Sequence, residues 1–175
     1  MKLIDMIKSD LERLCDPTIV NFFKYYCFSQ GTTFPYQVWY RIFSECKQHF
    51  FIKYTFGLLA YFFYRHYGFK YGISFDTNIH VGKGLKIVHG YGVIVNCSYI
   101  GDNFTIYQNC TFGSDKNNNV PIVGDNVTVF TGSIVIGDIQ LEDNCTIGAN
   151  SFVNSNVSEG SIVVGNPAHP INKNK

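Results

Sequence analysis

The sequence predicts a mainly β protein, a solenoid of short parallel strands preceded by a helical segment. Three observations support this. Apolar residues recur every six positions after residue 72, the fifth place of most hexads is small or apolar, and most aromatic residues precede the repeat. A period of six with one buried position fits neither a 3.6-residue helix nor a hairpin ladder. A solenoid with three hexads in each coil, in which each coil covers the next, would bury that position.

Composition excludes several classes of protein. The chain has 175 residues, of which 46% are hydrophobic and 15% charged, so it is folded rather than disordered. With 14 basic and 13 acidic residues, it is not built to bind a nucleic acid backbone. The six cysteines show no C-x-x-C pair, and we expect reduced, buried thiols rather than disulfides or a metal site. No signal peptide is evident, which favours the cytoplasm.

Residues 1–72 form the first predicted unit. They hold 21 of the 29 aromatic residues and carry a net charge of +4, against −3 for the remainder. Helical spacing begins at Leu3, Asp16-Pro17 is a predicted N-cap for a second helix, and further helices follow around Ile42 and through Tyr54 to Tyr64. The last stretch is too short to span a membrane. It is either buried at a subunit or domain contact or a membrane-surface element. The basic residues beside it are Lys47, Lys53, Arg65 and Lys70.

Residues 73–163 form the repeat, and 164–175 a tail. Small residues in the fifth place include three cysteines, and Gly or Asp nearby is expected to turn the chain with positive φ or an Asx-turn. The phase slips twice, by one residue between Val93 and Ile100 and by five after Phe112. The second slip makes the loop 113–122, a predicted lid or substrate clamp. The thirteen inward residues are Phe75, Val81, Ile87, Val93, Ile100, Ile106, Phe112, Val123, Val129, Val135, Leu141, Ile147 and Val153.

The segments VGKGLKIVHGYGVIV, IGDNFTIYQNCTFG, PIVGDNVTVFTGSIVIG and IGANSFV, with GNPA at residues 165–168, resemble hexapeptide-repeat acyltransferases, and more narrowly the serine acetyltransferase branch. The FKYGI entry at Phe69 to Ile73 is similar to O-acetyltransferases of surface polysaccharides. The resemblance implies a left-handed parallel β-helix and a homotrimer with active sites between subunits. It also implies acetyl-CoA as co-substrate and acetyl transfer to a hydroxyl without a covalent enzyme intermediate or a metal.

His89, in IVHGYG, corresponds to the family's catalytic histidine. An imidazole suits this role because a hydroxyl becomes a good nucleophile only as a base removes its proton, and Gly90 would let a ligand approach the backbone. His80, on the neighbouring hexad, is expected to be a turn residue. The family's aspartate that orients the histidine is replaced by Ser74, so the orienting group is expected to be Ser74 or Asp76.

The acceptor positions depart from the family pattern. Val88 stands where the family has an acidic residue for the substrate amine, and Asn119 and Val120 replace the Arg-His pair that holds the serine carboxylate. Asp16 matches a family carboxylate near the acceptor. These replacements favour a sugar hydroxyl in surface-polysaccharide synthesis, with serine as the alternative acceptor and a non-catalytic scaffold as the alternative outside enzymes.

The resemblance also places the donor. The pantetheine arm of the family's coenzyme A runs along the coils beside small residues, and the phosphates need cations, for which Lys173 in the tail is the expected partner. The remaining positions implied for the donor are Gly113, Ser114, Thr131, Gly132 and Ala149.

Overall fold

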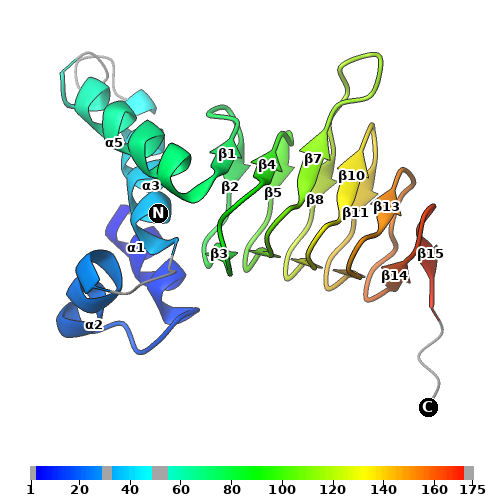
Figure 1. Cartoon of the computed structure of the whole chain (residues 1–175), viewed down its shortest axis with the longest axis horizontal. Coiled ribbons are helices and arrows are strands. Elements are labelled where there is room, and N and C mark those ends of the chain that lie inside the picture. The colour runs from blue at the N-terminus through cyan, green and yellow to red at the C-terminus, as the bar shows by residue number, and fades with distance from the viewer. Residues whose placement is uncertain (1–2, 29–32, 49–54, 172–175) are drawn as a thin grey trace.

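A computed structural model describes residues 3–28, 33–48 and 55–171. Four helices and a π-helical turn gather at one end of a long prism of strands, and the C-terminal strands close the other end (Figure 1). The helical elements are α1 (Leu3–Glu12), α2 (Ile19–Phe23), η1 (Lys24–Phe28), α3 (Phe34–Gln48) and α5 (Phe56–Tyr71).

The prism has three faces, each a sheet in which strands of successive coils pair in parallel. Among the described strands, only β14 and β15 pair antiparallel, at the end of face C. Face A holds β1 (Ile73–Phe75), β4 (Val93–Val95), β7 (Thr111–Gly113), β10 (Ile134–Ile136) and β13 (Phe152–Val153). Face B holds β2 (His80–Val81), β5 (Tyr99–Ile100), β8 (Ile122–Val123) and β11 (Gln140–Leu141). Face C holds β3 (Lys86–Ile87), β6 (Thr105–Ile106), β9 (Thr128–Val129), β12 (Thr146–Ile147), β14 (Ile162–Val164) and β15 (His169–Pro170).

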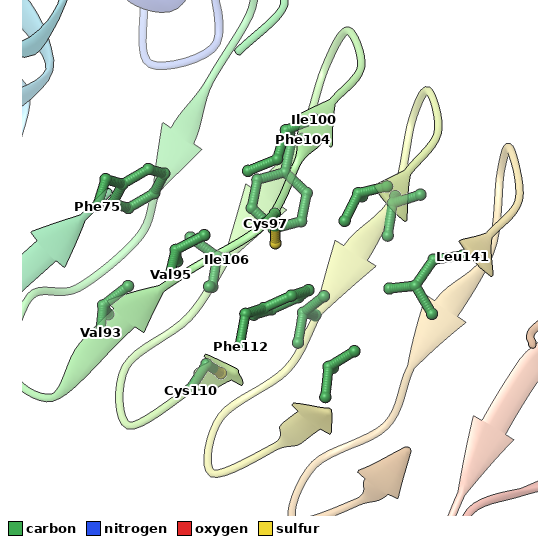
Figure 2. Packing of buried hydrophobic residues seen from close by; sticks show 14 of the residues in the cluster. Phe75, Val93, Val95, Cys97, Ile100, Phe104, Ile106, Cys110, Phe112 and Leu141 are labelled. Atoms are coloured by element: carbon green, nitrogen blue, oxygen red, sulfur yellow. The ribbon is translucent and has the colours of Figure 1, made fainter. Parts of the chain in front are cut away.

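The predicted solenoid is therefore confirmed, and its core is the predicted one. All thirteen inward residues of the hexads are buried, and those labelled in Figure 2 lie along the prism interior. Cys97, Cys110 and Cys145 occupy core positions as free thiols, as expected. Burial raises the pKa of all three thiols, that of Cys145 to about 12, so they are inert packing groups.

The glycines at the corner between faces B and C serve another purpose than predicted. Gly82 and Gly101 lack positive φ. A Cβ on Gly82 would lie 2.6 Å from the Gly101 carbonyl oxygen of the next coil, and a Cβ on Gly101 would lie 2.7 Å from the Gly124 carbonyl oxygen. The residues with positive φ are instead asparagines such as Asn103 and Asn126. The side-chain amide of Asn103 donates a hydrogen bond to the side-chain oxygen of Asn126 at 3.0 Å. Close stacking of the coils thus selects glycine here.

A buried ion pair ties the helices to the first coil. Arg41 of α3 donates from Nε and Nη2 to the Asp10 carboxylate of α1, both at 2.9 Å, and also donates to the Val81 and Gly82 carbonyls at 2.6 Å. Asp10 in turn accepts from the Leu85 amide at 2.8 Å. Both side chains are almost fully buried. The helical unit therefore caps the open end of the solenoid with satisfied charges.

Two helix boundaries differ from prediction. Thr18 rather than Asp16 is the N-cap of α2, because the Thr18 hydroxyl accepts from the Asn21 amide at 3.1 Å. The last helix runs from Phe56 to Tyr71 and ends at Gly72 in the left-handed conformation; Lys53 and Tyr54 lie outside the described residues. Among the described helices, none has both the length and the apolar character that crossing a membrane requires.

Candidate active site

His89 lies in the corner that leads from β3 on face C to β4 on face A. In the next three coils this corner separates inward residues by six positions, as from Ile106 to Phe112. In the first coil Ile87 pairs with Ile106 and Val95 pairs with Phe112, so the separation is eight. The predicted one-residue shift between Val93 and Ile100 was therefore wrongly placed. Compared with the regular six-residue spacing, the His89 corner has two residues more and the next corner has one residue fewer.

Hydrogen bonds identify the two added residues. The Gly132 amide donates to the Gln108 carbonyl at 3.1 Å, and in the preceding coil the Asn109 amide donates to the Tyr91 carbonyl at 3.0 Å. Tyr91 thus holds the place that Gln108 holds one coil later, and His89 and Gly90 are the insertion. The extra length carries His89 out of the regular corner, where its side chain is exposed.

The end of α5 fixes this corner. The Tyr91 amide donates to the Tyr71 carbonyl, and the Gly92 amide to the Gly72 carbonyl at 2.9 Å. A Cβ on Gly90 would collide with the Tyr71 carbonyl oxygen. Glycine is therefore needed at position 90 for packing on the helix, a reason separate from the predicted ligand approach. Tyr91 has φ 71°, a conformation uncommon for a bulky residue and often found at functional sites.

Three predicted donor residues share the edge on which His89 lies. Thr131 and Ala149 follow Gln108 in successive coils, about 4.8 Å apart along the prism. The Thr131 hydroxyl donates to the Gln108 carbonyl at 3.0 Å, and Gly132 has φ 75°. We call Gln108, Thr131, Gly132 and Ala149 the corner column. Sequence reasoning missed Gln108, whose Oε1 is buried without a hydrogen-bond donor among the described residues.

Ser74 lies on the outer side of β1, paired with Ile94, and is exposed. It lines a pocket between α5 and face A, together with Arg65, Phe69 and Gly92, which adjoins the His89 corner. Ser74 is thus on the face next to His89, although no hydrogen bond joins the two side chains in the structure. Arg65 and Phe69 were not predicted as site residues, because nothing in the repeat indicates which helix side chains reach the first coil.

Asp76 belongs to the opposite edge, between faces A and B. It follows β1, and its carboxylate accepts from the Asn78 amide at 2.7 Å. The length of the three-residue strand, roughly 10 Å, separates it from the His89 edge. The structure therefore assigns Asp76 to a turn, and the prediction that it reaches His89 in the same chain is wrong.

The loop 113–122 leaves the end of β7 on this same opposite edge and is the longest excursion of the prism (Figure 1). Asp115 organises it, accepting from the amides of Asn117 and Asn119 at 2.8 and 2.9 Å and from the Asn119 side chain at 3.1 Å. These hydrogen bonds lower the pKa of Asp115. Gly113, Ser114 and Asn119 are consequently separated from the corner column within one chain, and the Asn119 amide is engaged inside the loop.

The other predicted residues are scattered. Asp16 is exposed in the connection between α1 and α2, where its carbonyl accepts from the Asn21 side chain at 2.9 Å. Val88 is half-buried beside His89. Lys173 lies outside the described residues. Within the described residues, no group of three or more His, Cys, Asp and Glu side chains gathers as a metal site.

Comparisons with known proteins agree with the fold. Residues 121–155 match the family described as bacterial transferase hexapeptide (six repeats). The chain is 44% identical over 103 residues to a serine acetyltransferase of Staphylococcus epidermidis and 43% identical over 103 residues to one of Staphylococcus aureus. Each alignment covers 56% of this chain and 48% of the relative, so the chain matches about half the length of these relatives.

Solved structures extend the similarity to the helices. A Neisseria gonorrhoeae serine acetyltransferase superposes with a TM-score of 0.78 at 24% identity, covering 97% of this chain and 66% of that chain. A serine acetyltransferase in complex with CoA gives a TM-score of 0.77 at 22% identity, covering 97% and 69%. At this identity the superpositions establish the fold. The chain therefore has the left-handed parallel β-helix fold of the solved serine acetyltransferases, and its residues 121–155 match the hexapeptide-repeat family.

Proposed function

We propose that this protein is an acetyl-CoA-dependent O-acetyltransferase in which His89 is the general base, and that its acceptor is serine. The observation that carries the proposal is the two-residue insertion, which exposes the imidazole at the end of the corner column. The next three coils keep the six-residue spacing at this corner.

The chemistry needs one base and no covalent intermediate. His89 removes the proton of the acceptor hydroxyl as its oxygen attacks the thioester carbonyl, so that a C–O bond forms and the C–S bond breaks. The proton then passes from the imidazolium to the departing thiolate, which leaves as CoA. Such a base contributes about 10² to 10⁴ in rate. Ser74, on the adjoining face, is the nearest predicted candidate to orient the ring.

The corner column suits the pantetheine arm. Ala149 is exposed and Thr131 half-buried, so an extended chain can lie along the prism edge towards His89. A relative with this fold has been solved in complex with CoA, which supports a donor of this kind.

The predicted site residues lie on two different edges of the prism. A second copy of the chain would bring the two sets of residues together. His89 and the corner column lie between faces C and A, whereas Gly113, Ser114 and the loop lie between faces A and B. In a homotrimer of side-by-side prisms, one subunit's loop can reach the next subunit's column. The trimer and a site shared between subunits remain part of the proposal, supported by the family resemblance.

The comparisons favour serine as the acceptor, since the relatives named above are serine acetyltransferases. Arg65 adds a cation to the pocket beside Ser74, which could pair with the serine carboxylate. The predicted surface-polysaccharide acceptor finds no support in these comparisons. A neutral sugar is nevertheless the second candidate, because Val88 offers no charge to an amine and Asn119 is bonded to Asp115.

The test follows the loss of the acetyl-CoA thioester with serine and, separately, with a panel of sugars and nucleotide sugars. Serine should be acetylated, and His89→Ala should lower kcat by about 10² or more while CoA binding persists. His80→Ala, on face B, is the matched control and should retain activity. Turnover with a sugar alone would replace serine by the second candidate. Full activity of His89→Ala would contradict the base assignment, and no turnover with any acceptor would favour the scaffold.

A further inference from the structure

One side of α5 is exposed and strongly apolar. Leu58, Phe62 and Phe69 are 64%, 62% and 76% exposed, and their spacing of four and seven residues places them on one side of the helix. Gly57, Ala60, Tyr64 and Gly68 are buried on the other side. A row of large apolar side chains on a protein surface usually marks a site of contact with another protein, a ligand or a membrane.

Basic residues accompany these apolar side chains. The Arg65 guanidinium lies 4.6 Å from the centre of the Phe69 ring, and the Lys70 ammonium lies 5.4 Å from that of Tyr71. No Asp or Glu occurs anywhere from residue 46 to residue 75, a stretch with four Lys and Arg residues. The exposed side of α5 is therefore apolar and cationic, with no acidic residue along its sequence.

We propose that this surface docks onto an anionic lipid bilayer, with α5 lying along the membrane. We call it the α5 face; it comprises Leu58, Leu59, Phe62, Arg65, Phe69 and Lys70. Aromatic and leucine side chains beside Arg and Lys are the composition of helices that insert one side into the headgroup region. Anionic headgroups attract the cations while the acyl boundary accepts the rings.

The charges argue against a second copy of the chain as the occupant. A two-fold contact would set the α5 face against itself, and Arg65 and Lys70 of each copy would then meet cations only. Lipid phosphates would neutralise these charges. Since no described helix can cross a membrane, the contact is a surface one. Arg65 and Phe69 of the α5 face also line the pocket beside Ser74, so the test below measures vesicle binding and not acetyl transfer.

The test sediments the full chain with vesicles of phosphatidylcholine alone or mixed with phosphatidylglycerol. The wild-type chain should bind the anionic vesicles about tenfold more tightly than the neutral ones, and less at high salt. The double variant Leu58→Ser/Phe62→Ser should lose at least about tenfold in binding. The double variant Ile19→Ser/Val20→Ser, which removes even more exposed apolar side chains from α2, should bind as the wild type does.

A second measurement tests the proposal in case the Leu58→Ser/Phe62→Ser variant folds poorly. Phe62→Trp, combined with Trp39→Phe, places a single tryptophan on the α5 face, and its emission should shift to the blue with anionic vesicles. Absence of vesicle binding by the wild-type chain, or equal binding by the α5 and α2 variants, would overturn the proposal. A change in oligomer mass caused by the α5 variant without vesicle binding would assign the face to a second copy instead.

Discussion

In the solenoid each coil repeats the contacts of its neighbour, whereas the helical cap meets the first coil through contacts that occur once. The solenoid depends on inward residues of one kind, stacked along the prism, as at Ile87, Ile106 and Val129. The cap depends on single contacts of different kinds, among them the buried ion pair of Asp10 with Arg41. Repetition spreads stability over many similar positions, so the unique contacts should be the more sensitive to single substitutions. The His89 corner, where the two regions meet, is also where the repeat is broken.

Removing one partner of the buried pair should have the largest effect on stability. Arg41→Ala leaves the Asp10 carboxylate uncompensated and two carbonyls of the first coil without their donor, and should cost about 3–5 kcal/mol in urea unfolding. Lys8→Ala removes the half-exposed partner of Glu12 and should cost less than about 1 kcal/mol. Similar losses in the two variants would show that the cap does not depend on this pair.

Adding one methyl group between coils should have the next largest effect. Gly101→Ala sets a Cβ against Gly124 and Asp125 of the next coil and should cost about 1–3 kcal/mol. Gly113→Ala is the matched control, because its Cβ would come no closer than 3.9 Å to its nearest neighbour. If Gly101→Ala unfolds at the same urea concentration as the wild-type chain, the coils are less closely stacked than described.

Thiol labelling distinguishes the two regions without mutation. Cys27 on the cap is exposed, whereas Cys97, Cys110 and Cys145 are buried in the solenoid, where burial raises their pKa and depletes the thiolate. Near pH 8 a thiol reagent should modify Cys27 promptly and the three solenoid thiols only in denaturant. Mass spectrometry of the labelled chain checks this. Rapid labelling of Cys145 in the native protein would mean that the coils open easily.

The smallest effect should be confined to the loop. The pKa of Asp115 is below its ordinary value because the folded loop donates hydrogen bonds to the carboxylate, so folding favours the ionised form. The loop's added stability is therefore present at neutral pH and is lost as the pH falls through that lowered pKa. Asp115→Asn should speed amide exchange at Asn117 and Asn119 at neutral pH, with the midpoint of global unfolding almost unchanged. Unaltered amide exchange would show that Asp115 does not organise the loop.

How far the sequence predicts the structure follows from the same comparison. The six-residue period identifies the inward residues wherever one repeated geometry imposes it, but it names Val93 where Val95 pairs with Phe112. The location of the His89 insertion was not predictable, since a two-residue gain and a one-residue loss nearby leave a net slip of one. Nor could the period show that Arg65 reaches the pocket beside Ser74, or that Asp76 serves a turn, because these depend on how the cap docks and which edge each corner forms.

We propose that the insertion makes His89 the base at one end of the corner column. A crystal structure of the assembled protein with coenzyme A tests this role. The pantetheine arm should lie along Ala149 and Thr131, with its sulfur beside the His89 ring. A sulfur bound at another edge of the prism, or a His89 ring packed away from the arm, would contradict it.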